Sequence, residues 1–519
     1  MLKGSYETQL TLLDNNFLLE ELIPQDSWAR EFRTFLVTIA PREFHEELYH
    51  PTLGRHAANP TVLTGALLVQ ARKGWSSREL EHHVRFDMET KYALGLEVYH
   101  KGFDHSTFEY HRINRMLKGQ KDRQIFDVVI ESLIKDGLLS PGADQILDST
   151  YHNANIAIVG PLEFIRRGIV NIIRTLRKEG VVTNDEIKTI GLGGFLAHLD
   201  RKAKASKLSD GRLDEQKKRT ELKKVHEQAV KLLELVANRP MSIDGEVEVK
   251  LLQRALEETI EVEEDEIQVK KRNSVKDRMV SLSDPEARYG VKNKQITFNG
   301  YKSHIAGTAD GLITAVVVTP GNVHDGKVLP ELVDELQEKG FTPDHALADS
   351  SYGYGENRQY TKDKNIQLYA RANAPGVPDG FSYIEERDTF TCPRGLESRT
   401  GNPVDKGIKL EYSFPIKHCQ DCPYLSTCCG GKKQKRLRLS KYHLVNAEGG
   451  ALNKTKEYKE AMRQRSNIER AFALLINQCK LRVLKRRGSR NALYQVLMAS
   501  TMLNIFSYFR LKKMEPRVA

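Results

Sequence analysis

The sequence has no hydrophobic run long enough to cross a membrane, and it has few cysteines for its length. No apolar stretch approaches the ~20 consecutive residues that a membrane-spanning helix needs. The N-terminus, MLKGSYETQL, lacks the apolar core of a secretory signal. Six cysteines in a chain of 519 residues do not indicate a disulfide framework. The sequence therefore predicts a soluble, cytoplasmic protein with no membrane partner.

The sequence also lacks an excess of acidic residues. Its 80 basic residues against 69 acidic residues give a net charge of +11 and an isoelectric point near 9.1. This balance is compatible with a polyanionic partner, although basic proteins without a nucleic-acid partner are common. The chain is long enough for about two to four domains, each with its own core.

One short stretch, residues 341–356 (FTPDHALADSSYGYGE), has the pattern of a buried strand that ends at a carboxylate. Its apolar run ends at Asp349, and the serines and glycines that follow break the strand. Open α/β sheets place their sites at the carboxyl ends of strands. Asp148 ends a similar run, Gln145-Ile146-Leu147, and Glu469 lies in a strongly helical stretch. One acid after a strand is usually a loop cap, but these three acids together predict an active site.

Residues 1 to about 130 have helical patterns. Thr61 to Arg72 is apolar-rich and predicts a helix that ends at Lys73-Gly74. A hydroxyl followed three residues later by a carboxylate is the sequence of a capping box, and it occurs at Ser76–Glu79 and again at Ser106–Glu109. The sequence therefore predicts a compact helical N-terminal unit.

The helix predicted to start at Ser106 carries several polar and basic side chains. They are His111, Arg112, Asn114, Arg115 and Lys118. On a short helix that follows a compact helical pair, Arg and Asn read base edges in the DNA major groove. We therefore predict that Arg112, Asn114 and Arg115 contact DNA. The alternative is an ordinary helical bundle with a solvated face.

A long charged tract, roughly residues 161–280, follows the segment of Asp148. Residues 222–236 and 252–260 have amphipathic spacing, and Pro240 separates the two. These stretches are too short for a long coiled coil. An antiparallel helical pair inserted into the core is the better interpretation.

From Arg288 onward the pattern changes to strands rich in β-branched and aromatic residues. An amphipathic helix then leads to the strand that ends at Asp349. The order predicts a mixed sheet flanked by helices, in which the acids converge if the insertions loop out from the sheet edge. The predicted strands are Gln295 to Phe298, Tyr301 to Thr308 and Leu312 to Thr319, with turns at Asn299-Gly300 and Asp310-Gly311.

Five of the six cysteines occur in a loop-rich stretch, residues 380–440. They are Cys392, Cys419, Cys422, Cys428 and Cys429. Zinc binds four thiolates at about 2.3 Å, and a Cys-x2-Cys bend supplies two of them. We predict a structural zinc held by the first four, with Cys429 as the competitor for the last place. The alternative is reduced thiols in a small loop domain. Cys479 has the helical spacing of a core residue.

Two basic runs flank Glu469 in the sequence. Residues 432–438 precede it, and residues 480–490 follow it. A run of charges is usually a solvated face, but two runs around an acid site indicate a surface that follows phosphates. The residues of the second run that we predict to contact DNA are Lys480, Arg482, Lys485, Arg486 and Arg487.

The three predicted acids have the chemistry of a metal site, because carboxylates are hard ligands that suit Mg²⁺ or Mn²⁺. Two such ions about 3.5–4 Å apart activate an attacking oxygen and stabilise the leaving oxygen of an in-line phosphoryl displacement. Asp148, Asp349 and Glu469 come from separate chain segments and could hold both ions around one phosphate. We therefore predict Mg²⁺, or Mn²⁺, as the cofactor.

Several sequence blocks occur together in a fixed order. This combination resembles the signature of bacterial insertion-sequence transposases of the DDE class, in the branch with a cysteine-rich insertion before the final glutamate. Residues 40–118 also resemble the helical domain that precedes the catalytic core in these proteins. The blocks are Leu147-Asp148-Ser149-Thr150 with Ala154-Asn155, Gly300-Tyr301-Lys302, Asn322-Val323-His324-Asp325, Ala348-Asp349-Ser350-Ser351-Tyr352-Gly353, and Arg465-Ser466-Asn467-Ile468-Glu469 ending near Arg487-Gly488.

The resemblance implies an RNase H-like catalytic fold interrupted by insertions, with Asp148, Asp349 and Glu469 as ligands of Mg²⁺. The domains would be a helical N-terminal DNA-binding domain (1–135), a first core segment (140–160), a charged helical insertion (161–285), a central core (286–375), a cysteine-rich insertion (376–445), and a final catalytic helix with basic C-terminal helices (446–519).

Some residues in these blocks have more than one interpretation. Arg465 matches the family's arginine four residues before the glutamate, where it would meet DNA or steady the acid. The alternative is a routine i, i+4 ion pair with Glu469. His324 and Asp325 are expected near the site, although a helix N-cap explains Asp325 equally well.

Other positions depart from the family pattern or have a simpler interpretation. Related transposases often have a tyrosine and a lysine where this chain has Met462 and Ile476. Lys480 is the candidate to replace that lysine in contacts with the DNA ends. Asp284 and Asp310 are predicted turn residues.

The resemblance implies a transposase that binds the terminal inverted repeats of its own mobile element. It would cleave the 3′ strand with a metal-activated water and use the new 3′-OH to attack target DNA, without a covalent protein–DNA intermediate. A homodimer or higher oligomer is expected on the double-stranded DNA, because two ends must be joined. The alternatives are an RNase H-like nuclease or resolvase, and a transposase-derived DNA-binding protein without catalysis.

Overall fold

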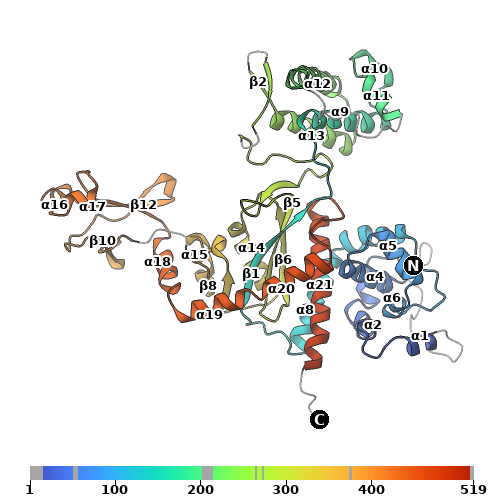
Figure 1. The fold of residues 1–519 in the computed structure, drawn as a ribbon, viewed down its shortest axis with the longest axis horizontal. Helices are drawn as coiled ribbons and strands as arrows, with labels where there is room; N and C mark the ends of the chain where they lie inside the picture. Colours follow the sequence, from blue (N-terminus) through green and yellow to red (C-terminus); the bar gives the residue numbers. More distant parts are fainter. Residues whose placement is uncertain are drawn as a thin grey trace, which may run out of the picture.

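The computed structural model describes residues 16–50, 57–200, 214–263, 266–271, 274–372 and 377–514. Its central domain is a mixed sheet surrounded by helices, and two further lobes extend from it (Figure 1). The predicted boundary at residue 375 lies outside the described residues, as do residues 201–213 of the predicted helical insertion. In the part of the chain that the structure describes, no helix is long and apolar enough to span a membrane.

The central sheet has six strands in the order β4-β5-β1-β7-β8, with β6 also paired to β5. β5 runs antiparallel to β1, β4 and β6, whereas β7 runs parallel to β1 and β8. This arrangement confirms the predicted RNase H-like α/β fold class. The strands are β1 (Gln145–Asn153), β4 (Arg288–Val291), β5 (Thr297–Gly307), β6 (Ile313–Pro320), β7 (His345–Ala348) and β8 (Gln367–Tyr369).

The β5–β6 hairpin turns at Asp310-Gly311, as predicted, and Gly311 supplies the left-handed backbone conformation of that turn. The predicted turn at Asn299-Gly300 is wrong, because both residues lie inside β5. A side chain on Gly300 would collide with the carbonyl oxygen of His152 on β1. The glycine is therefore needed for the close approach of two strands and not for a turn.

The first strand is longer than the sequence predicts. β1 pairs with the parallel strand β7 only as far as Leu147 opposite Ala348, but its pairing with β5 continues to Asn153. Asp148 is therefore in the middle of β1, and the prediction that it ends its strand is wrong. The antiparallel partner keeps the backbone extended beyond the point where the parallel partner stops.

Two helices, one after β6 and one near the C-terminus, pack on the central sheet. α14 (Leu329–Glu338) packs on β5 and β6 with its apolar side. α21 (Ser489–Met514) packs against β6 and also contacts α4 (Pro60–Lys73) and α8 (Lys121–Lys135) (Figure 1). The buried Asn504 of α21 accepts a hydrogen bond from the N–H of Ile313 at 2.8 Å and donates one to its carbonyl at 2.7 Å. The Asn504 side chain thus provides hydrogen-bond partners for the backbone N–H and carbonyl of Ile313 on β6.

The N-terminal helices share one hydrophobic core with the sheet and α21. The predicted helix ending at Gly74 is confirmed as α4, and the capping box of Ser76 and Glu79 is confirmed at α5. The second capping box is wrong, because Asp104 and not Ser106 caps α7. The helices are α1 (Asn16–Leu22), α2 (Trp28–Ile39), α3 (Glu43–Glu46), α4, α5 (Ser77–Phe86), α6 (Met88–Ala93), α7 (His105–His111), a π-helical segment (Arg112–Leu117) and α8.

The helical insertion is a lobe with its own core, at the top of Figure 1. The predicted pair appears as α12 (Glu215–Val236) and α13 (Ile243–Thr259), and both pack on α9 (Pro161–Lys178). The expected helix beyond residue 260 is wrong. Its β-branched residues instead form the hairpin β2–β3. The remaining elements are α10 (Asn184–Thr189), α11 (Gly193–Asp200), β2 (Ile260–Glu263) and β3 (Glu266–Val269).

The cysteine-rich insertion forms a second lobe, at the left of Figure 1. A hairpin, β9–β10, and a three-stranded sheet, β11-β12-β13, enclose a small core around Phe390 and Tyr412. Its elements are β9 (Ser382–Ile384), β10 (Thr389–Thr391), β11 (Asn402–Val404), β12 (Lys409–Ser413), α16 (Ile416–Gln420), α17 (Leu425–Cys429) and β13 (Arg436–Ser440). The chain returns to the central sheet through α18 (His443–Leu452), which packs on α15 (Gly355–Asp363).

We predict that Asn504→Leu destabilises the central domain. The substitution leaves the buried N–H and carbonyl of Ile313 without partners, and each unpaired group costs about 1–3 kcal/mol. Urea unfolding followed by fluorescence should show a clear fall in the core's midpoint. Asn238→Leu, at an exposed turn of the helical insertion, serves as the control and should leave that midpoint unchanged. Equal midpoints for Asn504→Leu and the unmodified protein would contradict the role given to Asn504.

Candidate active site

Two of the three predicted acids meet where β1 and β7 part. The last residue pair of the parallel ladder is Leu147 opposite Ala348, so Asp148 and Asp349 are the next residues on neighbouring strands. Asp349 follows β7 as predicted and caps a short 3₁₀ helix by accepting a 2.8 Å hydrogen bond from the N–H of Ser351. The Oδ1 atom of Asp148 accepts a 2.7 Å hydrogen bond from the N–H of Ser149. The strand register thus sets two carboxylates side by side.

Arg465 binds directly to Asp148, one of these two acids. It is the last residue of α19 (Lys456–Arg465), and its Nη1 atom lies 2.9 Å from Oδ2 of Asp148. Its ion-pair partner in the described structure is therefore Asp148, and the alternative of an i, i+4 pair with Glu469 is wrong. Burial raises the pKa of Asp148, and the negative charge of Asp349 adds to this rise. The Ser149 N–H and Arg465 offset only part of it.

Glu469 approaches the same region from a helix. α20 (Ile468–Ala473) packs on β1, and Ile468 is buried close to Gly307 of β5. The Glu469 side chain is exposed. Within the described residues, the carboxylate oxygens of Asp148, Asp349 and Glu469 do not all lie within 4.8 Å of one another. The structure thus brings two acids together and places the third on an adjacent helix.

A buried ion pair supports Asp148 from the opposite side. Nζ of Lys302, on β5, lies 2.7 Å from Oδ1 of Asp325, and the other oxygen of Asp325 accepts a 2.6 Å hydrogen bond from Ser149. Burial acts to raise the pKa of Asp325. Hydrogen bonds from Lys302 and Ser149 and the charge of Lys302 outweigh this effect, so the pKa is lowered from its ordinary value. The N-cap interpretation of Asp325 is wrong, because His324 caps that turn.

Three other predictions near the site have clear outcomes. Asp310 lies in a turn, as predicted. Asp284 also lies in a bend, but its carboxylate is buried and accepts a 2.5 Å hydrogen bond from Tyr301, so its description as a turn residue is incomplete. Cys479 is buried in the core, as predicted. The sequence spacing gives no signal for the Asp284–Tyr301 contact.

The donor set suits a hard divalent cation. Asp148 is a largely buried carboxylate next to a second carboxylate, and its ordinary ionised form is disfavoured there by burial. A divalent cation favours ionised oxygen ligands of this kind. Asp148 and Asp349 would be its ligands from the sheet, with Glu469 as the ligand from α20.

Several predicted DNA-contact residues instead join parts of the protein to each other. Arg112 is buried, with an ion pair to Glu109 at 2.9 Å and a hydrogen bond to Asn491 at 2.8 Å. Arg486 also binds Glu109, and it donates a 3.0 Å hydrogen bond to Ser77. The burial of Arg112 and the ion pair of Arg486 with Glu109 argue against base contact by either residue.

Two more residues of the second basic run have protein partners. Lys485 donates a hydrogen bond to the carbonyl of Gly74, and burial lowers the pKa of Lys485 to about 8. Arg482 donates a 2.5 Å hydrogen bond to the carbonyl of Tyr151 and lies 3.8 Å from the centre of its ring. The loop after η8 (Leu474–Gln478) thus forms hydrogen bonds both to the N-terminal helices and to β1.

The remaining predicted DNA-contact residues are accessible. Lys480 and Arg487 are exposed, and Arg487 donates a 2.8 Å hydrogen bond to the carbonyl of Asn155. Asn114 and Arg115 are half-buried, and the guanidinium of Arg115 lies 4.5 Å from the ring centre of Tyr49. With Arg465, whose side chain is 25% exposed beside Asp148, these four residues are the part of the predicted set that can reach a ligand outside the protein.

The five clustered cysteines line one small pocket of the cysteine-rich lobe. All are free thiols, and Cys429 is the most deeply buried. Burial and the neighbouring thiols of Cys419 and Cys428 raise the pKa of Cys429 to about 11. No three thiols among the described residues lie within 4.8 Å of one another. All the predicted zinc ligands thus line one pocket, and both Cys428 and Cys429 are available there as the fourth ligand.

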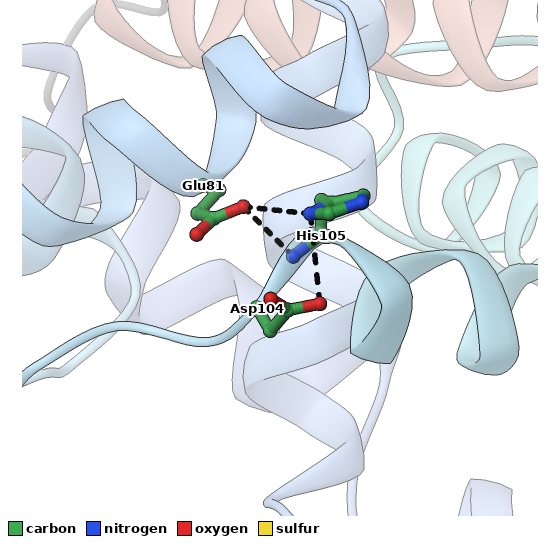
Figure 2. Close-up of side chains that lie close together, drawn as sticks. All are labelled: Glu81, Asp104 and His105. Atoms are coloured by element: carbon green, nitrogen blue, oxygen red, sulfur yellow. Dashed lines mark hydrogen bonds and ion pairs between the residues drawn. The ribbon is translucent and has the colours of Figure 1, made fainter.

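Figure 2 shows a different group of potential ligands, Glu81, Asp104 and His105, on the N-terminal helices. Nδ1 of His105 lies 2.9 Å from Glu81 and 3.5 Å from Asp104. Asp104 also caps α7, and Glu81 accepts a 3.0 Å hydrogen bond from the His105 N–H. Helix capping and an ordinary ion pair account for this group, of which Asp104 is exposed and the other two are half-buried.

Comparisons with known proteins match most of the chain. Residues 259–505 match the family described as "Transposase DDE domain", and residues 17–114 match "Transposase domain (DUF772)". Asp349 and Glu469 lie in the first range, whereas Asp148 precedes it. The transposase for insertion sequence element IS1106 of Neisseria meningitidis serogroup B is 33% identical over 101 residues, which are 20% of this chain and 33% of that relative. The matched segment thus spans about a third of the relative's length. No solved structure matches.

The Glu109 network predicts an acid-dependent stability difference. Burial acts to raise the pKa of Glu109, but hydrogen bonds from Arg486 and Ser77 and the charges of Arg486 and Arg112 lower it from 4.5 to about 2. A carboxylate whose pKa is lower in the folded than in the unfolded protein stabilises the fold at pH values above its unfolded-state pKa. The contribution of Glu109 to the free energy of unfolding is therefore lost as pH falls from 4.5 towards 2. We expect Glu109→Gln to cost about 2 kcal/mol at neutral pH, with the difference from the unmodified protein shrinking at acid pH.

The measurement is urea unfolding of both proteins at several pH values between neutral and pH 3. Glu97→Gln, which removes an exposed carboxylate of the same domain, is the matched control and should behave like the unmodified protein throughout. If the difference in free energy of unfolding between Glu109→Gln and the unmodified protein stayed constant with pH, the charge of Glu109 would not stabilise the contact between these elements.

Proposed function

Because this chain belongs to the insertion-sequence transposases of the DDE class, we propose that it binds the terminal inverted repeats of its element, cleaves the DNA ends and joins them to target DNA. Cleavage is phosphodiester hydrolysis by water, and joining uses the released 3′-OH as the attacking group. The observation that carries this proposal is the parallel register of β1 and β7, which sets Asp148 beside Asp349.

In this proposal Asp148, Asp349 and Glu469 hold Mg²⁺ or Mn²⁺. When bound, the metal activates the attacking oxygen and stabilises charge on the leaving oxygen. Asp148 and Asp349 are fixed by the strands, and the exposed Glu469 side chain completes the set by turning towards them. The 2.9 Å contact from Arg465 holds Asp148 in place, and the guanidinium is also close enough to the acids to approach a DNA phosphate.

Asp325 and Lys302 act through Ser149 in this arrangement. Their ion pair is largely buried and fixes the Ser149 hydroxyl, while the Ser149 N–H fixes Oδ1 of Asp148. Such supporting contacts keep a ligand in the orientation that a metal requires. We therefore describe Asp325, Lys302 and Ser149 as positioning residues.

The proposed partners are the double-stranded DNA of the element ends and of the target. Besides Arg465, the predicted contacts that we retain for DNA are the exposed Lys480 and Arg487 and the half-buried Asn114 and Arg115. Joining two ends in one reaction requires two active sites near each other, so we propose a homodimer or higher oligomer on DNA. A cytoplasmic location agrees with a DNA substrate in a bacterial cell.

We expect Asp349→Asn to abolish cleavage while leaving DNA binding intact, because the amide cannot replace an ionised metal ligand. The measurement uses a supercoiled plasmid carrying the native DNA that flanks this gene, purified protein and Mg²⁺. Asp344→Asn, an exposed acid at the opposite end of β7, is the matched control and should cleave normally.

Other results of the same assay would replace the proposal. Binding to the ends without cleavage, in Mg²⁺ and in Mn²⁺, would identify a transposase-derived DNA-binding protein without catalysis. Cleavage without joining of the 3′ ends would identify a nuclease or resolvase.

We also propose that the cysteine pocket binds a structural zinc ion. Cys392, Cys419, Cys422 and Cys428 are the proposed ligands, with Cys429 as the competitor for the last place. Support comes from five free thiols around one pocket in a lobe whose own core is small. Small domains of this kind often depend on a metal for stability.

Elemental analysis of the purified chain should therefore find about one zinc per molecule when four thiolates bind one ion. Cys422→Ser should remove the zinc and lower the melting temperature of the cysteine-rich lobe. Cys479→Ser alters the buried core cysteine and should keep full zinc content. A zinc-free unmodified protein after expression with added zinc would exclude the site.

A further inference from the structure

The cysteine-rich lobe divides its charges between its two halves. Residues 377–397, which contain the β9–β10 hairpin, hold 5 acidic and 2 basic residues. Residues 398–441, which contain the β11-β12-β13 sheet, hold 10 basic and 3 acidic residues. A random distribution of charge has no reason to separate so strongly within one small lobe. The separation makes the three-stranded sheet a basic surface on a lobe that projects from the core (Figure 1).

The register of this sheet decides which face is basic. Leu410 and Tyr412 of β12 lie opposite Leu439 and Leu437 of β13, and this face covers the core of the lobe. The alternate residues of the same strands point to the other face, because side chains alternate along a strand. They include Lys409, Arg436 and Arg438.

The cations on this face are outermost. Arg438 and Arg436 lie 2.6 Å and 3.5 Å from the carboxylate of Glu411, the acid between them. The Glu411 side chain is only 14% exposed, whereas those of Arg436 and Arg438 are 53% and 58% exposed. The arginines therefore cover the acid and are oriented by it, and their outer sides face solvent. Lys409 is also half-exposed, and its Nζ atom lies 2.9 Å from the half-exposed carboxylate of Asp405.

The preceding loop enlarges the same basic surface. Lys432 and Lys433 are exposed in the turn that leads into β13. Lys435 is different, because its Nζ atom donates a 2.8 Å hydrogen bond to the carbonyl of Cys428 inside the lobe. The accessible cations thus extend from the loop along β13 and onto β12.

We infer that this face, formed by Lys409, Arg436 and Arg438 with Lys432 and Lys433, is a second DNA-binding surface that contacts the phosphate backbone. This inference rests on the proposed function, since it assigns a DNA contact to a lobe outside the catalytic sheet. Arginines held by a carboxylate below them keep their donors aimed outward, which suits phosphate oxygens. Contacts to phosphate oxygens carry no sequence information directly, so the cations of this face bind without sequence preference.

The test measures DNA binding by the full-length chain at several salt concentrations. The triple variant Lys409→Gln, Arg436→Gln, Arg438→Gln is compared with the unmodified protein on a duplex that carries the native flanking DNA. Each lost phosphate contact makes the slope of log K against log salt less negative by about 0.9, so the triple variant should lose roughly 2 to 3 from that slope. The double variant Arg436→Lys, Arg438→Lys retains the charges and should keep most of the slope.

The matched control removes the same charge elsewhere. Lys223, Lys231 and Lys250 are exposed on the helices of the other insertion, and their triple substitution by Gln should leave the slope unchanged. An equal loss in this control would assign the effect to net charge and overturn the inference. So would an unchanged slope in the first triple variant.

The outcomes separate this inference from the proposed function. If the unmodified protein cleaves the element ends and the triple variant binds with an unchanged slope, only the inference about the lobe fails. If the unmodified protein does not bind the duplex at all, the proposed function fails with it. A change in oligomeric state of the triple variant, with an unchanged salt slope, would show that the basic face contacts the acidic hairpin of a second copy and would overturn the DNA assignment.

Discussion

The parallel pairing of β1 with β7 is the constraint on which the candidate site depends. The ladder is short and stops at Leu147 and Ala348, so Asp148 and Asp349 follow it at the same level of the sheet, where the two strands are no longer paired with each other. Placing two carboxylates together in a partly buried position is unfavourable without compensation. The structure supplies it through the Ser149 N–H and the guanidinium of Arg465. The surrounding helices and the Lys302–Asp325 pair can be understood as support for this one arrangement.

A second consequence of the fold concerns the arginine-rich loop between η8 and α21. It contacts the N-terminal helices and the end of β1 through Arg482, Lys485 and Arg486, and Arg490 adds a contact to the N-terminal helices from the first turn of α21. Arg490 reaches the buried Asp122, and Arg486 reaches Glu109. These charges therefore stabilise the joint between domains. In the sequence this basic run resembles a DNA-binding surface. In the structure, most of its charges instead bind groups within the protein, and the acids that they pair with lie on the N-terminal helices.

The two insertions show how a catalytic sheet tolerates long additions. Each has its own core and leaves the sheet at a loop, so its side chains add little to the packing around the acids. Their surfaces are then less constrained by the core than those of the sheet helices. The separation of charge in the cysteine-rich lobe is possible for this reason, since Arg436 and Arg438 of its basic face are more than half exposed.

The sequence by itself determined the elements whose signals are local. These are the helix and capping box around Gly74 and Ser76, the Asp310-Gly311 hairpin, the strand that ends at Asp349, and the core position of Cys479. Together with the ordered motif blocks, they were enough to predict the fold class and the family. Local backbone preference and side-chain periodicity carry this information because they act over a few neighbouring residues.

Only the tertiary structure decided the rest, because each remaining feature joins residues far apart in the chain. It extended β1 beyond Asp148 through pairing with β5, and it placed Gly300 inside a strand where β1 comes close. It paired Arg465 with Asp148 instead of Glu469, and it buried Arg112 against Glu109. A charged side chain has no sequence signal for its partner, since the choice depends on which opposite charge the fold brings within a few ångströms.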